Sequence, residues 1–159
     1  MWQYYSCHMA APADVLIHPA DHASPDYAEL IGLHSQAPLA VAERVRDGLA
    51  YRSFDLFRRH AALTAADLAA LVRIPARTLA RRKRARKLDP DESDRLVRLA
   101  RIFAMALALF EGDEVSTRRW LGTPLAALGG AAPLGFATTD PGAREVESLI
   151  GRLEHGVPT

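Results

Sequence analysis

This sequence offers little support for disulfide bonds, a membrane-spanning segment or a secretion signal. Its 159 residues include one cysteine, Cys7, which excludes an internal disulfide and makes a reducing cytosol the simpler compartment. The longest strongly apolar stretch, Ile102 to Phe110, is far shorter than the roughly 20 residues that a transmembrane helix needs. The N-terminus has no positive charge ahead of its few apolar residues, so we expect no signal peptide. A cytoplasmic protein is therefore the expectation.

The composition is that of a folded soluble protein, since 49% of the residues are apolar and 25% are charged. The length suits one compact domain, or two small domains that share a core. Apolar residues recur at helical spacing from Pro38 onward and no segment predicts a sheet, so the expected fold class is all-α. We expect a flexible N-terminal arm with one short helix near 26–31, a helix-turn-helix and dimerisation region, and a C-terminal helical domain (1–36, 37–111 and 112–159).

Charge is distributed unevenly along the chain. The net charge is +1, yet eight basic residues and no acidic residue lie between Arg73 and Lys87, so the rest of the chain is acidic. A basic island in an acidic protein is typical of nucleic-acid contact. The alternative is a solvated helix face, although such faces usually mix charges of both signs.

The residues around this island predict a helix-turn-helix. Thr64 is a good N-cap for a first helix that runs through Leu71 or Val72. Its hydroxyl can accept the amide proton of Asp67, and the Asp67 carboxylate can accept the amide proton of Thr64. Pro75 breaks that helix and suits the start of a second one, which ends near Arg86. Two short helices separated by about three residues form the helix-turn-helix arrangement.

The second helix of this pair carries the predicted DNA contacts. Its N-terminal residues should point at base edges if the helix enters a major groove, where arginine reads guanine through two hydrogen bonds. Leu79 and Ala80 are expected to face the first helix. We predict base contacts from Arg77, Thr78, Arg81 and Arg82, and phosphate contacts from Arg84, Arg86 and Lys87. Alternatively, Arg77 and Thr78 brace the motif internally or bind a partner protein.

A long helix is predicted to follow, from an acidic cap at Asp89 to Phe110. Its later half is apolar all round, so it is the expected central buried helix. Because it is too apolar for a lone surface helix, we expect part of it to pack against a second copy, in a dimer at least. A last helix, capped by Thr139, is expected to end before Gly156 with Leu153 among its inward residues.

Metal and nucleophile chemistry have weak support. The candidate ligands of the N-terminal arm fit no zinc spacing well, and they are Cys7, His8, His18, Asp21 and His22. Gly129-Gly130 lacks the surroundings of a phosphate-binding loop and predicts a tight turn with positive φ. We expect no catalytic residue, no metal ion and no cofactor. A metal-dependent enzyme built on the histidine-containing arm is the unfavoured alternative.

Two groups of short motifs carry a family resemblance. The first is Arg77-Thr78-Leu79 followed by Arg81-Arg82. The second, in the C-terminal half, consists of Trp120-Leu121, Pro124, Leu128-Gly129-Gly130, Pro133-Leu134, Thr139, Gly142-Ala143, Val146 and His155-Gly156. From about Ile31 to its end the chain thereby resembles the Xre/MbcA/ParS antitoxins, the partners of RES-domain toxins. Arg73 departs from the pattern, since the turn often has glycine there.

The resemblance implies an antitoxin whose C-terminal region docks on an NAD-consuming or ADP-ribosylating toxin and obstructs its NAD pocket. It also implies a complex with more than one copy of each chain and repression of its own promoter. We place the toxin-binding face on the last helix and tail, with a tryptophan as a possible anchor: Trp120, Arg144, Glu147, Arg152, Glu154, His155 and Gly156. A buried core tryptophan is the commoner case. The rival is a stand-alone helix-turn-helix transcriptional regulator whose C-terminal domain only dimerises.

Overall fold

The computed structural model describes residues 26–156, which contain helices, turns and two isolated bridges but no strand. The predicted all-α fold class is confirmed. In chain order the elements are α1 (Tyr27–Leu30), α2 (Pro38–Asp47), α3 (Tyr51–His60), α4 (Ala65–Leu71), α5 (Ala76–Ala85), α6 (Pro90–Leu109), α7 (Glu114–Gly122), the short 3-10 helix η1 (Ala126–Leu128), α8 (Pro133–Phe136) and α9 (Asp140–Glu154).

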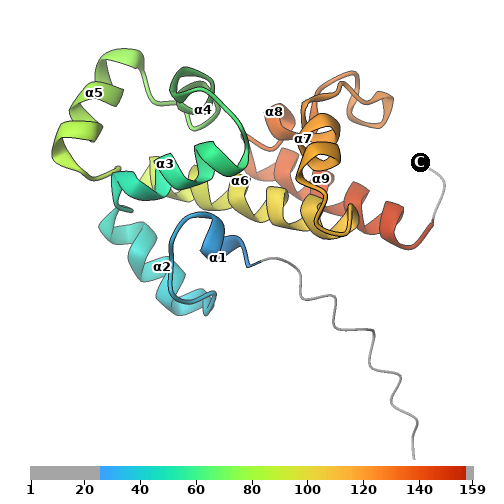
Figure 1. Cartoon of the computed structure of the whole chain (residues 1–159), viewed down its shortest axis with the longest axis horizontal. Helices are drawn as coiled ribbons and strands as arrows, with labels where there is room; N and C mark the ends of the chain where they lie inside the picture. Colours follow the sequence, from blue (N-terminus) through green and yellow to red (C-terminus); the bar gives the residue numbers. More distant parts are fainter. Residues whose placement is uncertain (1–25, 157–159) are drawn as a thin grey trace, which may run out of the picture.

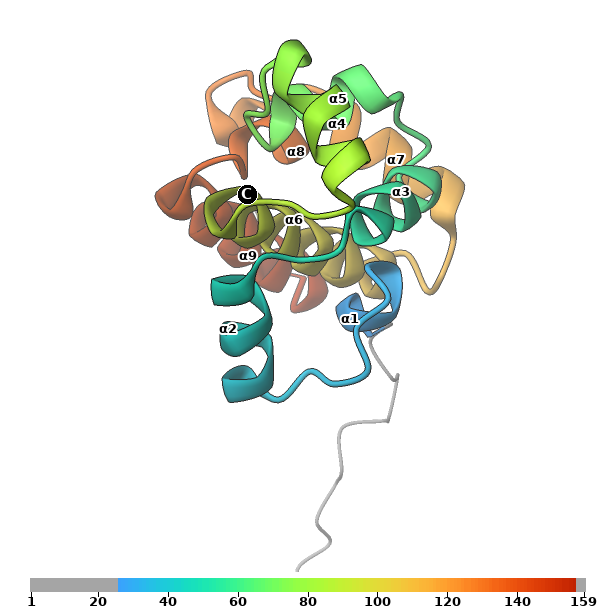
Figure 2. The same cartoon turned by 90° about the vertical axis from the view of Figure 1, so that its left-hand side faces the viewer.

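The longest helix, α6, runs through the middle of the molecule, and α1, α2, α7, α8 and α9 pack on it (Figure 1, Figure 2). Its apolar later half is buried as predicted, with Ile102 fully buried and Phe103 1% exposed. The Phe103 ring meets that of Phe57 from α3 edge-on, at 5.9 Å between centroids. The core therefore runs continuously from α1 to α9.

The chain's own helices cover the apolar surface of α6. Leu96, Leu99 and Ala106 are fully buried without a second copy. The apolar character of α6 therefore does not by itself require a second copy, and packing of part of this helix in a homodimer stays a prediction. Among residues 26–156 the exposed large apolar side chains are Leu39, Val115 and Leu153.

Helix starts follow the capping chemistry that the sequence predicts. The Thr64 hydroxyl accepts the amide proton of Asp67 at 3.1 Å, and the Asp67 carboxylate accepts that of Thr64 at 3.3 Å. The same reciprocal pair opens α6, between Asp89 and Glu92. Thr139 accepts from an amide in the first turn of α9, again as predicted. These local signals fix where three helices begin.

Two regions differ from the prediction. The short helix expected near 26–31 is present as α1, but Ala28 and Ile31 are fully buried, so these residues belong to the core and not to a loose arm. Residues 1–25 lie outside the described part. Leu153 is 37% exposed where an inward position was expected, because the last turn of α9 extends past the end of α6 (Figure 1).

Candidate functional site

The predicted helix-turn-helix is present as α4 and α5, joined by a turn at 72–75. Arg73 has a φ of 58°, the left-handed conformation that favours glycine. The turn therefore forms with arginine at this position, but its backbone is strained there. Ile74 buries its side chain in the core. The carbonyl oxygen of Val72 accepts a hydrogen bond from Nη1 of Arg95 on α6 at 3.3 Å. The turn is thus attached directly to the central helix.

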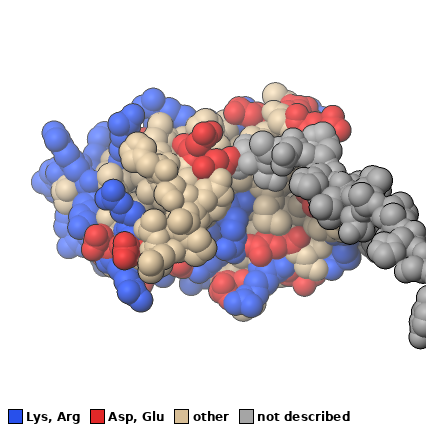
Figure 3. All heavy atoms as spheres, turned by 90° about the horizontal axis from the view of Figure 1, so that it is seen from below, with Lys and Arg blue, Asp and Glu red and all other residues tan. Residues whose placement is uncertain are grey.

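One side of α5 presents basic residues to solvent. Arg77, Arg81 and Arg84 are exposed, and their spacing of four and three residues places them on one face. Thr78 and Leu79 are half-buried on the other side. In Figure 3, Lys and Arg gather toward the left-hand end of the molecule, where α5 lies in Figure 1. The outward orientation predicted for Arg77 and Arg81 agrees with the structure, and Thr78 lies less open than predicted.

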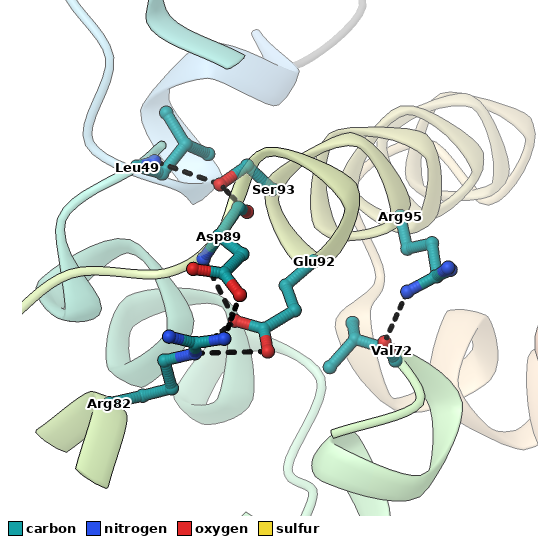
Figure 4. A network of polar contacts seen from close by, with 7 residues as sticks. All are labelled: Leu49, Val72, Arg82, Asp89, Glu92, Ser93 and Arg95. Carbon is teal, nitrogen blue, oxygen red and sulfur yellow. Dashed lines mark hydrogen bonds and ion pairs between the residues drawn. The ribbon is translucent and has the colours of Figure 1, made fainter. Parts of the chain in front are cut away.

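Two residues of α5 do not lie as predicted. Ala80 is exposed and does not face α4. The side chain of Arg82 is 13% exposed, and its Nε lies 3.0 and 2.8 Å from the two carboxylate oxygens of Glu92, while its Nη2 donates to Asp89 (Figure 4). The prediction that Arg82 faces outward is therefore wrong. It follows Leu79 by three residues and so shares the inner side of the helix, a signal that the sequence already contained.

The first turn of α6 joins several elements (Figure 4). The buried Ser93 hydroxyl accepts the amide proton of Leu49 at 2.8 Å and donates to the carbonyl oxygen of Asp89 at 2.7 Å. Glu92 accepts the amide proton of Asp89 at 2.9 Å. The amide of Leu88 donates to the carbonyl oxygen of Leu49 at 2.8 Å. This turn therefore holds the end of α5 and the loop before α3 on the core helix.

A basic hollow that the sequence did not predict lies beside the end of α5. Its volume is about 420 Å³, and its lining consists of Ala50, Tyr51, Arg52, Asp55, Leu56, Arg59 and Arg86. Arg52 and Arg59 are seven residues apart on α3 and so share a face, which was the available sequence signal. Burial is the main cause that raises the pKa of Tyr51. The two α3 arginines extend the basic surface beyond the island at 73–87.

The predicted toxin-binding residues of α9 lie mainly on its outer side. Arg152 is half-buried and pairs with Glu145 at 3.2 Å, and its Nη1 donates to the hydroxyl of Ser148 at 2.9 Å. The remaining members of this side are exposed, and they are Arg144, Glu154, His155 and Gly156. Leu153, an exposed apolar side chain, lies among them. The end of α9 thus presents polar and apolar groups together.

Glu147 and Trp120 make contacts within the chain. Glu147 accepts a hydrogen bond from Nε of Arg101 on α6 at 2.8 Å, which fastens α9 to the central helix. Trp120 is half-buried against the core, with its ring 6.2 Å from that of Phe110. The parts of the predicted toxin-binding face that are open to a partner are therefore the end of α9 and, nearer its start, Arg144.

The metal-ligand candidates of the N-terminal arm, from Cys7 to His22, lie outside the described residues. Within 26–156, histidine, cysteine, aspartate and glutamate side chains form no group of three or more that could hold a metal ion. No helix in the same range is long and apolar enough to span a membrane.

Two domain families match the chain. Residues 40–101 match the antitoxin Xre-like helix-turn-helix domain, and residues 105–156 match the antitoxin Xre/MbcA/ParS C-terminal toxin-binding domain. The chain is 34% identical over 128 residues to Antitoxin Xre of Yersinia enterocolitica, which covers 80% of this chain and 86% of that protein. The chain belongs to the Xre antitoxin family. The family predicted from the motifs is thereby confirmed.

Other Xre antitoxins align over shorter parts of the chain. Antitoxin Xre of Photorhabdus laumondii is 32% identical over 114 residues, 71% of this chain and 77% of that protein. Antitoxin Xre of Pseudomonas putida is 42% identical over 84 residues, 52% of each chain. The boundary between the two matched domains falls inside α6. This antitoxin therefore uses one helix for both its helix-turn-helix domain and its toxin-binding domain, which explains their common core.

Proposed function

We propose that this antitoxin neutralises a RES-domain toxin that consumes NAD or transfers ADP-ribose, and that it does so by binding and not by catalysis. The end of α9 and the tail after it occlude the toxin's active site. The exposed face of α5 binds DNA upstream of the antitoxin's own gene, so that the antitoxin also represses its own transcription. It acts in the cytoplasm, as a homodimer within a complex that holds more than one copy of each chain.

The end of α9 is the observation that carries the inhibitory part of the proposal. Leu153 is an exposed apolar side chain on a helix turn that extends past α6 (Figure 1). Glu154 and His155 beside it are exposed and polar. NAD carries two phosphates, so a pocket that binds it is expected to be basic, and the Glu154 carboxylate is complementary to such a pocket. An apolar anchor with a charged neighbour at a protruding end suits insertion into a cofactor site.

The two proposed surfaces lie far apart. α5 and the end of α9 are at opposite ends of the molecule's longest axis (Figure 1). Toxin bound at one end leaves the other end open to DNA. The toxin–antitoxin complex is therefore expected to bind the promoter with the same affinity as the antitoxin alone.

The proposal is tested by ending the chain after Ile150. The described residues beyond it, 151–156, are half-buried or exposed, so the truncation removes no buried side chain and the core is expected to stay folded. Cells that express the cognate RES-domain toxin should grow with the full-length antitoxin and fail to grow with the truncated one. Circular dichroism should show the same helix content per residue in both, apart from the missing last turn. Full rescue by a folded truncation would move the inhibitory site to the region between Trp120 and Pro133.

A pair of point variants sharpens this test. Leu153→Asp places a charge on the proposed anchor. Leu39→Asp makes the same change at a 72% exposed position of α2, a helix that lies away from the end of α9 (Figure 1). Leu39 is 72% exposed and Leu153 is 37% exposed, so the thermal stability of both variants is measured beside toxin binding. We expect Leu153→Asp to weaken toxin binding and growth rescue, and Leu39→Asp to leave both unchanged. The reverse pattern would assign toxin binding to the N-terminal half.

A further inference from the structure

The recognition helix α5 has few contacts that fix its direction. None of its ten residues is buried, and Thr78 and Leu79 are only half-buried. A helix of this length has little stability of its own in water, so its position depends on what the rest of the protein offers. Its far end is fastened by the backbone, since the amide of Tyr51 donates to the carbonyl oxygen of Arg86 at 3.0 Å. One further attachment within the helix would set the direction in which α5 points.

Arg82 supplies that attachment. Its side chain is 13% exposed and that of Glu92 is 8% exposed, so most of the pair is withdrawn from water. Nε of Arg82 donates to the Glu92 carboxylate and Nη2 donates to Asp89, so one side of the planar guanidinium is occupied within the chain (Figure 4). In the described part of the chain, no other basic residue of the 73–87 island pairs with a carboxylate.

The acceptor itself is held rigidly. Glu92 lies in the first turn of α6, where its carboxylate also accepts the amide proton of Asp89 at 2.9 Å as half of the helix cap. α6 is the buried central helix on which α1, α2, α7, α8 and α9 pack. A partly buried, hydrogen-bonded ion pair to such an anchor is far more constraining than an exposed one, because solvent screens it less.

We propose that Arg82 is a positioning residue for DNA recognition: its ion pair with Glu92 and Asp89 locks α5 to α6, so that Arg77 and Arg81 meet the groove in a fixed direction. This inference rests on the proposed DNA binding by α5. It removes Arg82 from the set of base-contacting residues and adds Glu92, a carboxylate in the core helix, to the residues that DNA affinity requires. An acidic residue that is needed for binding an anion is the distinctive consequence.

Glu92→Gln tests the proposal directly. Glutamine has nearly the same shape and can still accept the Asp89 amide proton in a helix cap, but it has no charge to hold the guanidinium. If Arg82 only positions α5, the variant should bind a duplex of the DNA upstream of the antitoxin's own gene about tenfold more weakly. If Arg82 is instead a phosphate contact that Glu92 holds back, the same variant should bind more tightly, and the proposal is overturned.

Arg82→Met and the double variant complete the test. A positioning role predicts that Arg82→Met weakens binding without changing the dependence of affinity on salt, and that the double variant is no weaker than the weaker single variant. The exposed neighbour provides the matched control, since Arg81→Met should lower the log–log salt slope if it contacts a phosphate. A slope lowered by about 0.9 in Arg82→Met would make Arg82 a direct phosphate contact and overturn the proposal.

Hydrogen exchange separates this inference from the proposed function. In Glu92→Gln the amides of α5 should exchange about tenfold faster than in the wild type, while those of α9 keep their protection. Unchanged protection of α5 would show that the ion pair does not hold the helix. If the wild type fails to bind the upstream duplex, the DNA part of the proposed function is wrong, and the exchange rates still decide whether Arg82 and Glu92 fix α5.

Discussion

Replacing Ser93 with alanine should destabilise the antitoxin through one orphaned hydrogen-bond donor. Ser93 is fully buried, and its hydroxyl accepts the amide proton of Leu49 at 2.8 Å. Within residues 26–156 that amide has no other partner. The carbonyl oxygen of Asp89, which the hydroxyl also contacts, keeps the backbone amide of Ser93 at 2.9 Å and remains satisfied.

The loss of stability in Ser93→Ala is set by the Leu49 amide, which loses its only partner, and not by the Asp89 carbonyl oxygen, which keeps one. A buried amide left without a partner costs about 1–3 kcal/mol, whereas removal of a hydroxyl from a carbonyl that keeps another donor costs little. Alanine leaves almost no cavity, so the expected loss in the free energy of unfolding is about 2 kcal/mol. For a protein of this length that corresponds to a fall in Tm of about 4–8 °C.

Thr117→Val is the matched control. Thr117 is also fully buried on a helix, and its hydroxyl donates to the carbonyl oxygen of Asp113 at 2.8 Å, but it accepts no amide proton in the described part of the chain. Valine has the same shape, so thermal or urea unfolding should show a loss below about 1 kcal/mol. Equal losses for Ser93→Ala and Thr117→Val would refute the assignment of the effect to the Leu49 amide.

The other predictions concern DNA, the turn and pH. Arg77→Ala should cost about 1–3 kcal/mol on the preferred DNA site and relax its specificity, while Arg84→Ala should weaken specific and random DNA alike and lower the salt slope by about 0.9 in filter-binding or anisotropy titrations. Arg73→Gly should raise Tm by about 1–3 °C, because glycine adopts a φ of 58° without strain. The relief of strain in the folded state is expected to outweigh the greater conformational entropy of glycine in the unfolded chain, and a lower Tm would contradict this. Hydrogen bonds from the hydroxyl and amide of Ser116 lower the pKa of Asp113 in the folded protein. The ionised Asp113 carboxylate therefore stabilises the fold above its ordinary pKa of 3.8, and this stabilisation is lost as the pH falls through the lower pKa of the folded state. The gap in Tm between wild type and Asp113→Asn should therefore narrow in acid, and a constant gap would argue against it.

The order of the helices could be predicted from the sequence because their ends carry local chemistry. The reciprocal cap at Thr64 and Asp67 involves neighbours three residues apart, and Pro75 and Pro90 limit where a helix can begin. The same holds for the turn at Gly129-Gly130, where both φ values are positive as expected. The prediction failed where position depends on distant partners. α1 packs on α3 and α6, and its few residues give no local sign of that contact.

The candidate site also has parts that local sequence determined and parts that depend on distant contacts. The basic island and the family motifs by themselves determined that this antitoxin has a helix-turn-helix domain and a toxin-binding domain, because charge and residue type are written in the sequence. Helical spacing from Leu79 places Arg82 on the inner side of α5, but only the tertiary structure decided that the Glu92 carboxylate lies there to pair with it. Arg81 and Arg82 are adjacent and chemically identical, yet one is exposed and the other meets Glu92 ten residues later on another helix. That choice depends on how α5 crosses the start of α6, and packing of the whole core sets that crossing.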